Sequence, residues 1–174
     1  MNQMVRQQSL DILLSGNGLW NTWRQTYADV QAFEPDLHEV NLHGAFLRGI
    51  DFHEADLTEA NLQQADLQEA DLRNADLRHA NLQGADLSEA NLQGACLHGA
   101  ELRGAILCRA NLTEADLSYA DLRGVDLAGG NMKKAKLDHV RFDQTTNFAH
   151  DPGAVDHPTP EEKLAHASFP PSTT

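Results

Sequence analysis

The chain has 174 residues and a net charge of −13, because 26 acidic side chains outnumber 13 basic ones. This balance argues against direct binding to nucleic acid, whose phosphates require a basic patch. Hydrophobic residues make up 41% of the chain, yet no apolar run approaches the roughly 20 residues of a membrane-spanning helix. The run Ile12-Leu13-Leu14 is also too short for a signal peptide. Composition therefore predicts a cytoplasmic protein that does not bind membranes.

Two short helices are predicted near the N-terminus. Residues 4–14 favour a helix that ends at Ser15 and Gly16, since glycine commonly follows the last helical turn. Asn17 can cap a second helix over about residues 18–29, because its side chain can accept a hydrogen bond from the first turn.

A five-residue repeat starts at Leu37 and continues without interruption to Phe142. Its 22 central positions hold Leu at 19 places, and the residue two positions earlier is Ala at 16 of them. The residue between these two is Asp ten times and Asn six times. The repeating unit is therefore Ala-(Asp/Asn)-Leu-X-X.

A period of five fits neither a helix nor a continuous strand. Five helical residues turn through about 500°, which scatters successive Leu side chains around the axis, and strand side chains alternate with a period of two. Within one unit, however, Ala and Leu share a face of a short extended segment while Asp or Asn points away. If the two X residues turn a corner of about 90°, four units close one coil of 20 residues, and the chain makes about 5.5 coils. We expect Leu62, Leu82, Leu102 and Leu122 to form one buried column.

The repeated segments resemble the pentapeptide repeat family closely from residue 36 to about 144, as in residues 55–59 and 85–89. The resemblance implies an all-β solenoid, a right-handed quadrilateral β-helix, and its handedness comes from the family alone. The segment from Trp20 to Arg24, followed by residues 35–37, resembles the lead-in of cyanobacterial members and implies a cyanobacterial source. We expect three regions: a short α-helical N-terminal cap (1–34), the β-helix (35–144) and a mostly flexible C-terminal tail (145–174).

Trp20, Trp23 and Tyr27 lie on one face of the second predicted helix. This face is either an aromatic binding surface or a lid on the first coil, and we favour the lid because an open solenoid end exposes core side chains and backbone. Outward-pointing Phe46 could meet the same lid. Bulky residues at inward positions of the first coil support this interpretation: Val40, Ile50 and Phe52.

Beyond residue 144 the repeat ends and five of the six prolines of the chain follow. Thr159-Pro160-Glu161-Glu162 has the pattern of a helix start. A short helix to about residue 167 would be marginal on its own.

Outward residues can be sorted by side, because every fourth unit lies on the same side of the coil. The units centred on residues 37, 57, 77, 97, 117 and 137 define the acidic side, with seven acidic and two basic side chains. Simple solvation is the favoured explanation of this charge, and a functional acidic stripe that binds a basic protein is the alternative. The candidate partner-binding residues are Asp56, Glu59, Asp76 and Asp116.

No catalytic motif is visible, so we expect a protein that is not an enzyme and needs no cofactor or metal. His79 and His98 lie in adjacent coils but are offset along the side, which favours scattered surface histidines over a metal site. Cys96 and Cys108 fall on opposite sides and should both be free thiols, because a disulfide needs Cα atoms within about 7 Å.

Two functions remain open. The first is a noncatalytic scaffold or protein–protein interaction module with an unidentified protein partner and no small-molecule ligand. The second rests on the resemblance, since some pentapeptide repeat proteins mimic DNA and bind DNA gyrase. This chain shares the acidic rod but has no loop insertion within its coils and no strongly apolar C-terminal helix.

Overall fold

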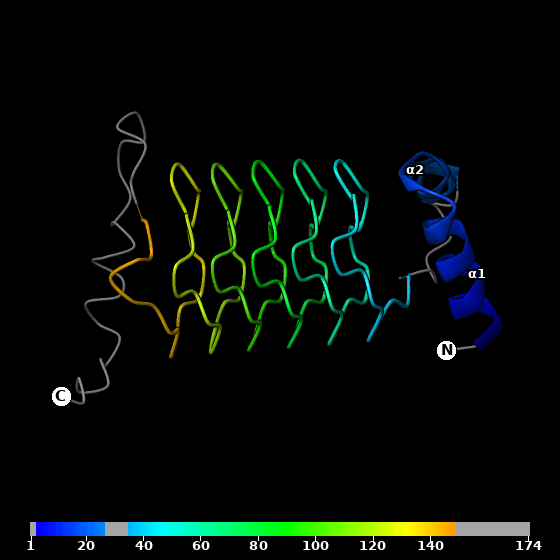
Figure 1. Ribbon diagram of the computed structural model, residues 1–174. Helices are drawn as coiled ribbons and strands as arrows, with labels where there is room; N and C mark the ends of the chain where they lie inside the picture. Colours follow the sequence, from blue (N-terminus) through cyan, green and yellow to red (C-terminus); the bar gives the residue numbers. More distant parts are fainter. Residues whose placement is uncertain (1–2, 27–34, 149–174) are drawn as a thin grey trace.

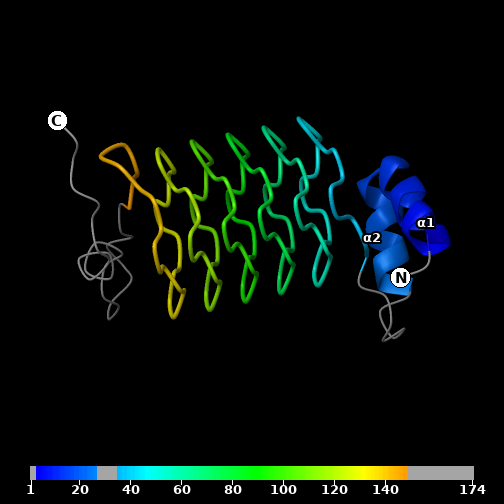
Figure 2. The same ribbon diagram turned by 90° about the horizontal axis from the view of Figure 1, so that it is seen from below.

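The computed structural model describes residues 3–26 and 35–148. Two helices, α1 (Gln3–Leu14) and α2 (Asn17–Thr26), lie at one end of a stack of coils (Figure 1). The view from below shows the same arrangement, with the coils following one another along a single axis (Figure 2). Within the described residues, no helix is long and apolar enough to cross a membrane.

Neighbouring coils are joined by parallel bridges between residues 20 positions apart, from Asp36 with Asp56 to Asp121 with Arg141. Four pentapeptides therefore complete one coil, as the period predicted. Three kinds of backbone hydrogen bond between coils repeat along the stack. Examples are from the Leu82 amide to the Glu101 carbonyl (2.8 Å), from the Gly84 amide to the Arg103 carbonyl (2.9 Å) and from the Asn81 amide to the Ala60 carbonyl (2.9 Å). Because each bridge is isolated, the described part of the solenoid contains no extended strand.

The two X residues form a tight turn between one side and the next. The amide of the following Ala donates to the carbonyl of the central Leu, as from Ala85 to Leu82 at 3.1 Å. The second X residue has φ between +56° and +70° in every unit from Glu39 to His139. Glycine adopts this conformation without penalty, which explains its frequency there.

The Asp or Asn of the repeat supports the same turn. In most units its side-chain oxygen accepts the amide of the first X residue, as from Thr58 to Asp56 at 3.0 Å and from Gln83 to Asn81 at 3.1 Å. Short polar side chains favour such local bonds to the backbone. The repeated carboxylate is therefore a structural group first, whatever it also contributes to binding.

The core is a column of inward Leu and Ala side chains along the axis. Leu62, Leu82, Leu102 and Leu122 are at most 1% exposed. Burial of each such side chain stabilises the fold by roughly 2 kcal/mol. At the C-terminal end the inward side chains are more exposed, and the partly buried ring of Phe142 packs edge-on against the ring of Phe148.

The ladder extends slightly past the predicted end of the repeat. Asp126 bridges to Asn147, 21 positions later, and the Leu127 amide donates to the Asn147 carbonyl at 2.7 Å. The hydroxyl of Thr146 donates to the Leu122 carbonyl at 2.9 Å. Residues 145–148 therefore pack on the last coil, although the repeat pattern ends at residue 144. The remaining tail, with the helix predicted near 159–167, lies outside the described residues.

Candidate partner-binding surfaces

Polar side chains of α2 occupy the open edge of the first coil. Asn17 donates to the carbonyls of Phe46 (3.1 Å) and Arg48 (3.3 Å). Asn21 donates to the Gly49 carbonyl and accepts the amide of residue 51, both at 2.9 Å. Elsewhere in the stack, carbonyls equivalent to those of Phe46 and Arg48, and amides equivalent to that of residue 51, pair with the preceding coil. The helix therefore satisfies part of an edge that would otherwise be unpaired.

Trp20 joins the same edge to the core. Its indole Nε1 donates to the Asp51 carbonyl at 2.6 Å, and its fully buried ring meets Phe52 edge-on with centroids 5.5 Å apart. Arg24 donates to the His53 carbonyl. Partly buried Trp23 stands 5.2 Å from the Trp20 ring.

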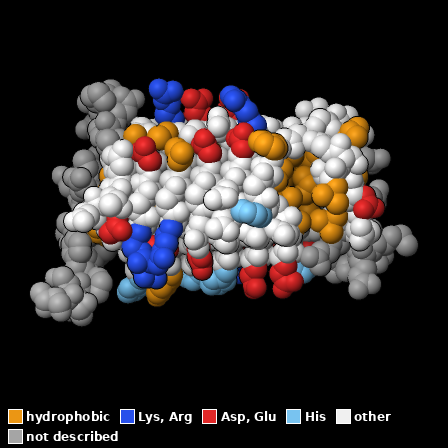
Figure 3. Space-filling view, viewed as in Figure 1, with side chains coloured by type: hydrophobic (Ala, Val, Ile, Leu, Met, Phe, Trp, Pro, Cys, Tyr) orange, Lys and Arg blue, Asp and Glu red, His pale blue; other side chains and the backbone are white. Residues whose placement is uncertain are grey.

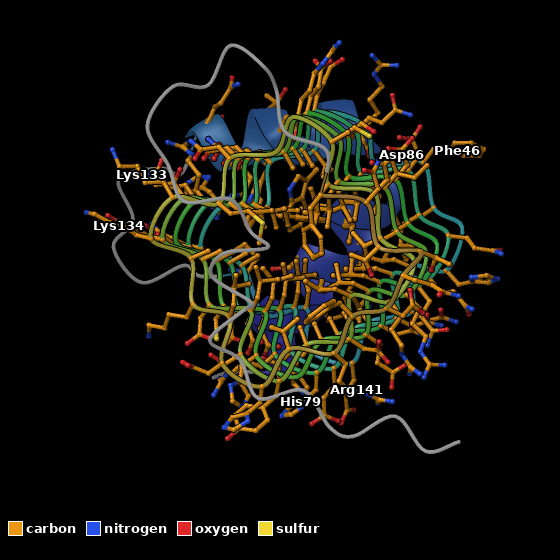
Figure 4. All side chains as sticks on the ribbon, turned by 90° about the vertical axis from the view of Figure 1, so that its left-hand side faces the viewer. Phe46, His79, Asp86, Lys133, Lys134 and Arg141 are labelled. Carbon is orange, nitrogen blue, oxygen red and sulfur yellow. The ribbon has the colours of Figure 1, made fainter. Side chains whose placement is uncertain are left out.

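The structure thus places two of the three predicted cap residues against the coil, whereas Tyr27 lies outside the described residues. Asn17 begins α2, and its side-chain amide donates hydrogen bonds to backbone carbonyls of the first coil. The expectation for Phe46 is wrong, because its side chain is 86% exposed and points away from the ribbon (Figure 4). Only its carbonyl is held by the cap.

The acidic side is not a uniform row of free carboxylates. Two nitrogens of Arg78 donate hydrogen bonds to the Asp76 carboxylate. Partial burial of Asp76 opposes its ionisation, but the hydrogen bonds from Arg78 outweigh this effect and lower the pKa of Asp76. Lys136 lies 3.3 Å from Asp116. Of the four candidates, only Asp56 and Glu59 form no ion pair in the described part of the chain.

The negative charge is unevenly distributed along the axis. Residues 36–95 hold twelve carboxylates and three basic side chains, whereas residues 96–148 hold seven of each. Along the lower edge of Figure 3, acidic side chains accordingly lie toward the helical end and basic ones toward the other. The strongest negative field therefore surrounds the first three coils, and it includes exposed Glu39 and Glu59.

A row of aromatic rings continues the acidic side past these carboxylates. His79 meets His98 edge-on at 6.1 Å, His98 lies 5.1 Å from Tyr119, and Tyr119 stacks on His139 at 4.8 Å. Gly99 leaves room for this row, since a Cβ there would stand 2.7 Å from Nδ1 of His79. The histidines that the sequence suggested were scattered are therefore in ring contact.

Two groups of donor atoms escaped the sequence analysis. Each group joins an aspartate and a histidine of one unit to an aspartate of the next coil, and the donor atoms lie within 4.8 Å of one another, close enough to hold a metal ion. The motif search missed both groups because the third residue is distant in the sequence. In the second group, Arg73 already holds Asp71, which favours an ion-pair network. The two groups are Asp36, His38 and Asp56, and Asp51, His53 and Asp71.

Both cysteines are free thiols. Burial and a hydrogen bond with Asp126 raise the pKa of Cys108, so the adjacent Arg109 does not activate it. Arg109 instead pairs with Glu89 at 3.1 Å.

Alkylation of the folded protein at pH 8 is therefore expected to modify Cys108 about tenfold more slowly than in the unfolded chain, because thiolate is the reactive form. Mass spectrometry of the peptides over time measures this ratio. A disulfide between Cys96 and Cys108 would contradict the four-sided arrangement.

Five-residue units that pair every 20 residues form a solenoid. The fold therefore defines a repeat protein of the solenoid class. The sequence profile of a family described as pentapeptide repeats (8 copies) matches residues 36–74, 70–107 and 108–144. The chain belongs to the pentapeptide repeat family, as the sequence predicted.

The chain is also similar to several solved structures. A pentapeptide repeat protein, Rfr23, from the cyanobacterium Cyanothece 51142 is 31% identical with a TM-score of 0.64, covering 75% of this chain and 99% of that chain. HetL, involved in heterocyst differentiation regulation in Nostoc sp. strain PCC 7120, is 29% identical with a TM-score of 0.38, covering 63% and 73%. QnrB1, a plasmid-mediated fluoroquinolone resistance protein, is 22% identical with a TM-score of 0.31, covering 63% and 58%. No curated protein sequence matches significantly.

Proposed function

We propose that this protein is a noncatalytic interaction scaffold whose first three coils bind a basic surface of a partner protein. The observation that carries the proposal is the net charge of −9 on residues 36–95, beside a neutral second half. The regular backbone of the solenoid spaces side chains of neighbouring coils about 4.8 Å apart along the axis. The carboxylates therefore hold fixed positions and together create one negative electrostatic field. The proposal needs no cofactor, and the cytoplasmic location expected from composition stays a prediction.

Local structure supports the division into two halves. Glu39 and Glu59 occupy equivalent turn positions in adjacent coils, with φ of 56° and 57°. Both are exposed and form no ion pair with a described residue. Glu114 occupies the same kind of turn position (φ 62°) in the neutral half and is paired with Lys134 at 2.7 Å. A basic partner would therefore be attracted more strongly to Glu39 and Glu59 than to Glu114.

Charge reversal at matched positions tests the proposal. We expect Glu59→Lys to weaken binding of a fluorescent decalysine peptide about tenfold at low salt, and Glu114→Lys to weaken it far less. Both variants change the net charge equally and replace the same residue type in the same turn, which Lys134 shows that lysine can adopt. Fluorescence anisotropy at rising salt gives the affinities.

Binding of the unaltered protein should also weaken steeply with salt, because the Debye length is only about 10 Å at 0.1 M. Equal losses from Glu59→Lys and Glu114→Lys would contradict an interface located on the first three coils. Binding that does not respond to salt would contradict the electrostatic mechanism itself.

The alternative, a DNA mimic that binds gyrase or another basic nucleic-acid-binding protein, uses the same carboxylates. The restriction of the charge to residues 36–95 makes the negative rod short. A supercoiling assay separates the two proposals, since a mimic inhibits or protects gyrase and a scaffold for another partner leaves its rate unchanged.

A further inference from the structure

Three arginines from successive coils surround one carboxylate on the side that carries the units centred on residues 102, 122 and 142. Asp121 is 8% exposed. Arg123 donates to both of its oxygens, from Nε at 2.8 Å and from a terminal nitrogen at 2.6 Å. Arg103 donates from Nε at 2.8 Å, and a terminal nitrogen of Arg141 lies 3.5 Å away.

The other two carboxylates of these three units, those of Glu101 and Asp143, have other partners. Glu101 accepts the side-chain amide of Gln83. Asp143 accepts the amide and the hydroxyl of Thr145, at 2.9 and 2.5 Å. Neither forms an ion pair with an arginine in the described part of the chain, so three guanidinium groups share the single charge of Asp121.

The guanidinium groups keep unused donors that face solvent. Arg103 uses only Nε, and Arg141 makes no hydrogen bond with its side chain to any described residue. Their side chains are 50% and 61% exposed. Arg141 projects from the lower right of the solenoid viewed along its axis (Figure 4), and basic side chains gather over the C-terminal coils on the face drawn in Figure 3.

We propose that Arg103, Arg123 and Arg141 bind a phosphate dianion. The planar fork of arginine matches two oxygens of a phosphate group, and hydrogen bonds between charged groups are the stronger ones. Each guanidinium group stays positively charged near neutral pH and therefore complements the negative charge of a phosphate monoester. Asp121 orients the guanidinium groups of Arg103 and Arg123, which lowers the ordering cost of binding. This site lies outside the acidic coils and does not depend on their function.

Nuclear magnetic resonance of the full chain tests the site. Titration with inorganic phosphate at constant ionic strength, pH 7.5, is expected to shift the Nε–H signals of Arg103 and Arg123 saturably. The paired change Arg103→Gln and Arg141→Gln should weaken this binding at least tenfold. The control pair, Arg109→Gln and Lys133→Gln, removes the same charge from two other sides and should leave the affinity within about twofold.

A second titration identifies the source of the phosphate. A peptide carrying one phosphoserine is compared with inorganic phosphate and with its unphosphorylated form. Tighter binding of the phosphopeptide supports a phosphoprotein as the source, and equal binding supports a free phosphate compound. Shifts that never saturate, shifts reproduced by chloride, or equal losses in the test and control pairs would overturn the site. Backbone signals that keep their positions in each variant show that the fold is intact.

Discussion

Leu82→Ala is expected to lower the free energy of unfolding by about 2–5 kcal/mol. Leu82 is fully buried in the Leu62–Leu122 column, and the rigid ladder on either side cannot collapse into the space that truncation leaves. Each coil packs only on its neighbours, so the loss also weakens the coupling between the two halves of the stack. Urea unfolding followed by circular dichroism measures the change.

Exposed Gln93 provides the control, since its side chain forms no hydrogen bond with a described residue. Gln93→Ala should change the free energy of unfolding by less than about 0.5 kcal/mol. Similar losses from Leu82→Ala and Gln93→Ala would contradict the inward placement of the leucines.

Trp20→Ala is expected to be comparably damaging, with a loss of about 3–5 kcal/mol in the stability of the N-terminal end. The change removes a fully buried ring from Phe52 and the indole donor from the Asp51 carbonyl. A buried carbonyl left unpaired costs about 1–3 kcal/mol of this total. Hydrogen exchange of the first-coil amides measures the local stability.

The same variant should associate with itself, because release of α2 uncovers an unpaired edge together with core side chains. Size-exclusion chromatography should show oligomers for Trp20→Ala and for deletion of residues 1–33. Leu19→Ala is the matched control on the same helix, since Leu19 is 61% exposed. A monodisperse and equally stable Trp20→Ala protein would transfer the two tryptophans from a lid to a binding surface.

The interior of the solenoid follows from the sequence alone. Ala and Leu, two residues apart, must share a face, and the left-handed turn position accepts the glycines that recur there. These rules act within five residues, so the unit is legible without tertiary information. The opposite placement of Cys96 and Cys108 follows from counting units. The uneven charge between residues 36–95 and 96–148 was equally available in the sequence, but sorting residues by side concealed it.

The contacts between surface side chains of neighbouring coils, and those between the cap and the first coil, were decided only by the tertiary structure. Asn17, Asn21 and Arg24 bond to backbone groups 28 to 31 residues away, and no periodic signal marks them as edge-capping residues. The exposure of Phe46, and the partners of Arg103 and Arg141, depend on side-chain directions that the repeat does not specify. Local propensity determines the five-residue unit, whereas the surface is determined by which flexible side chains meet when units 20 residues apart are stacked.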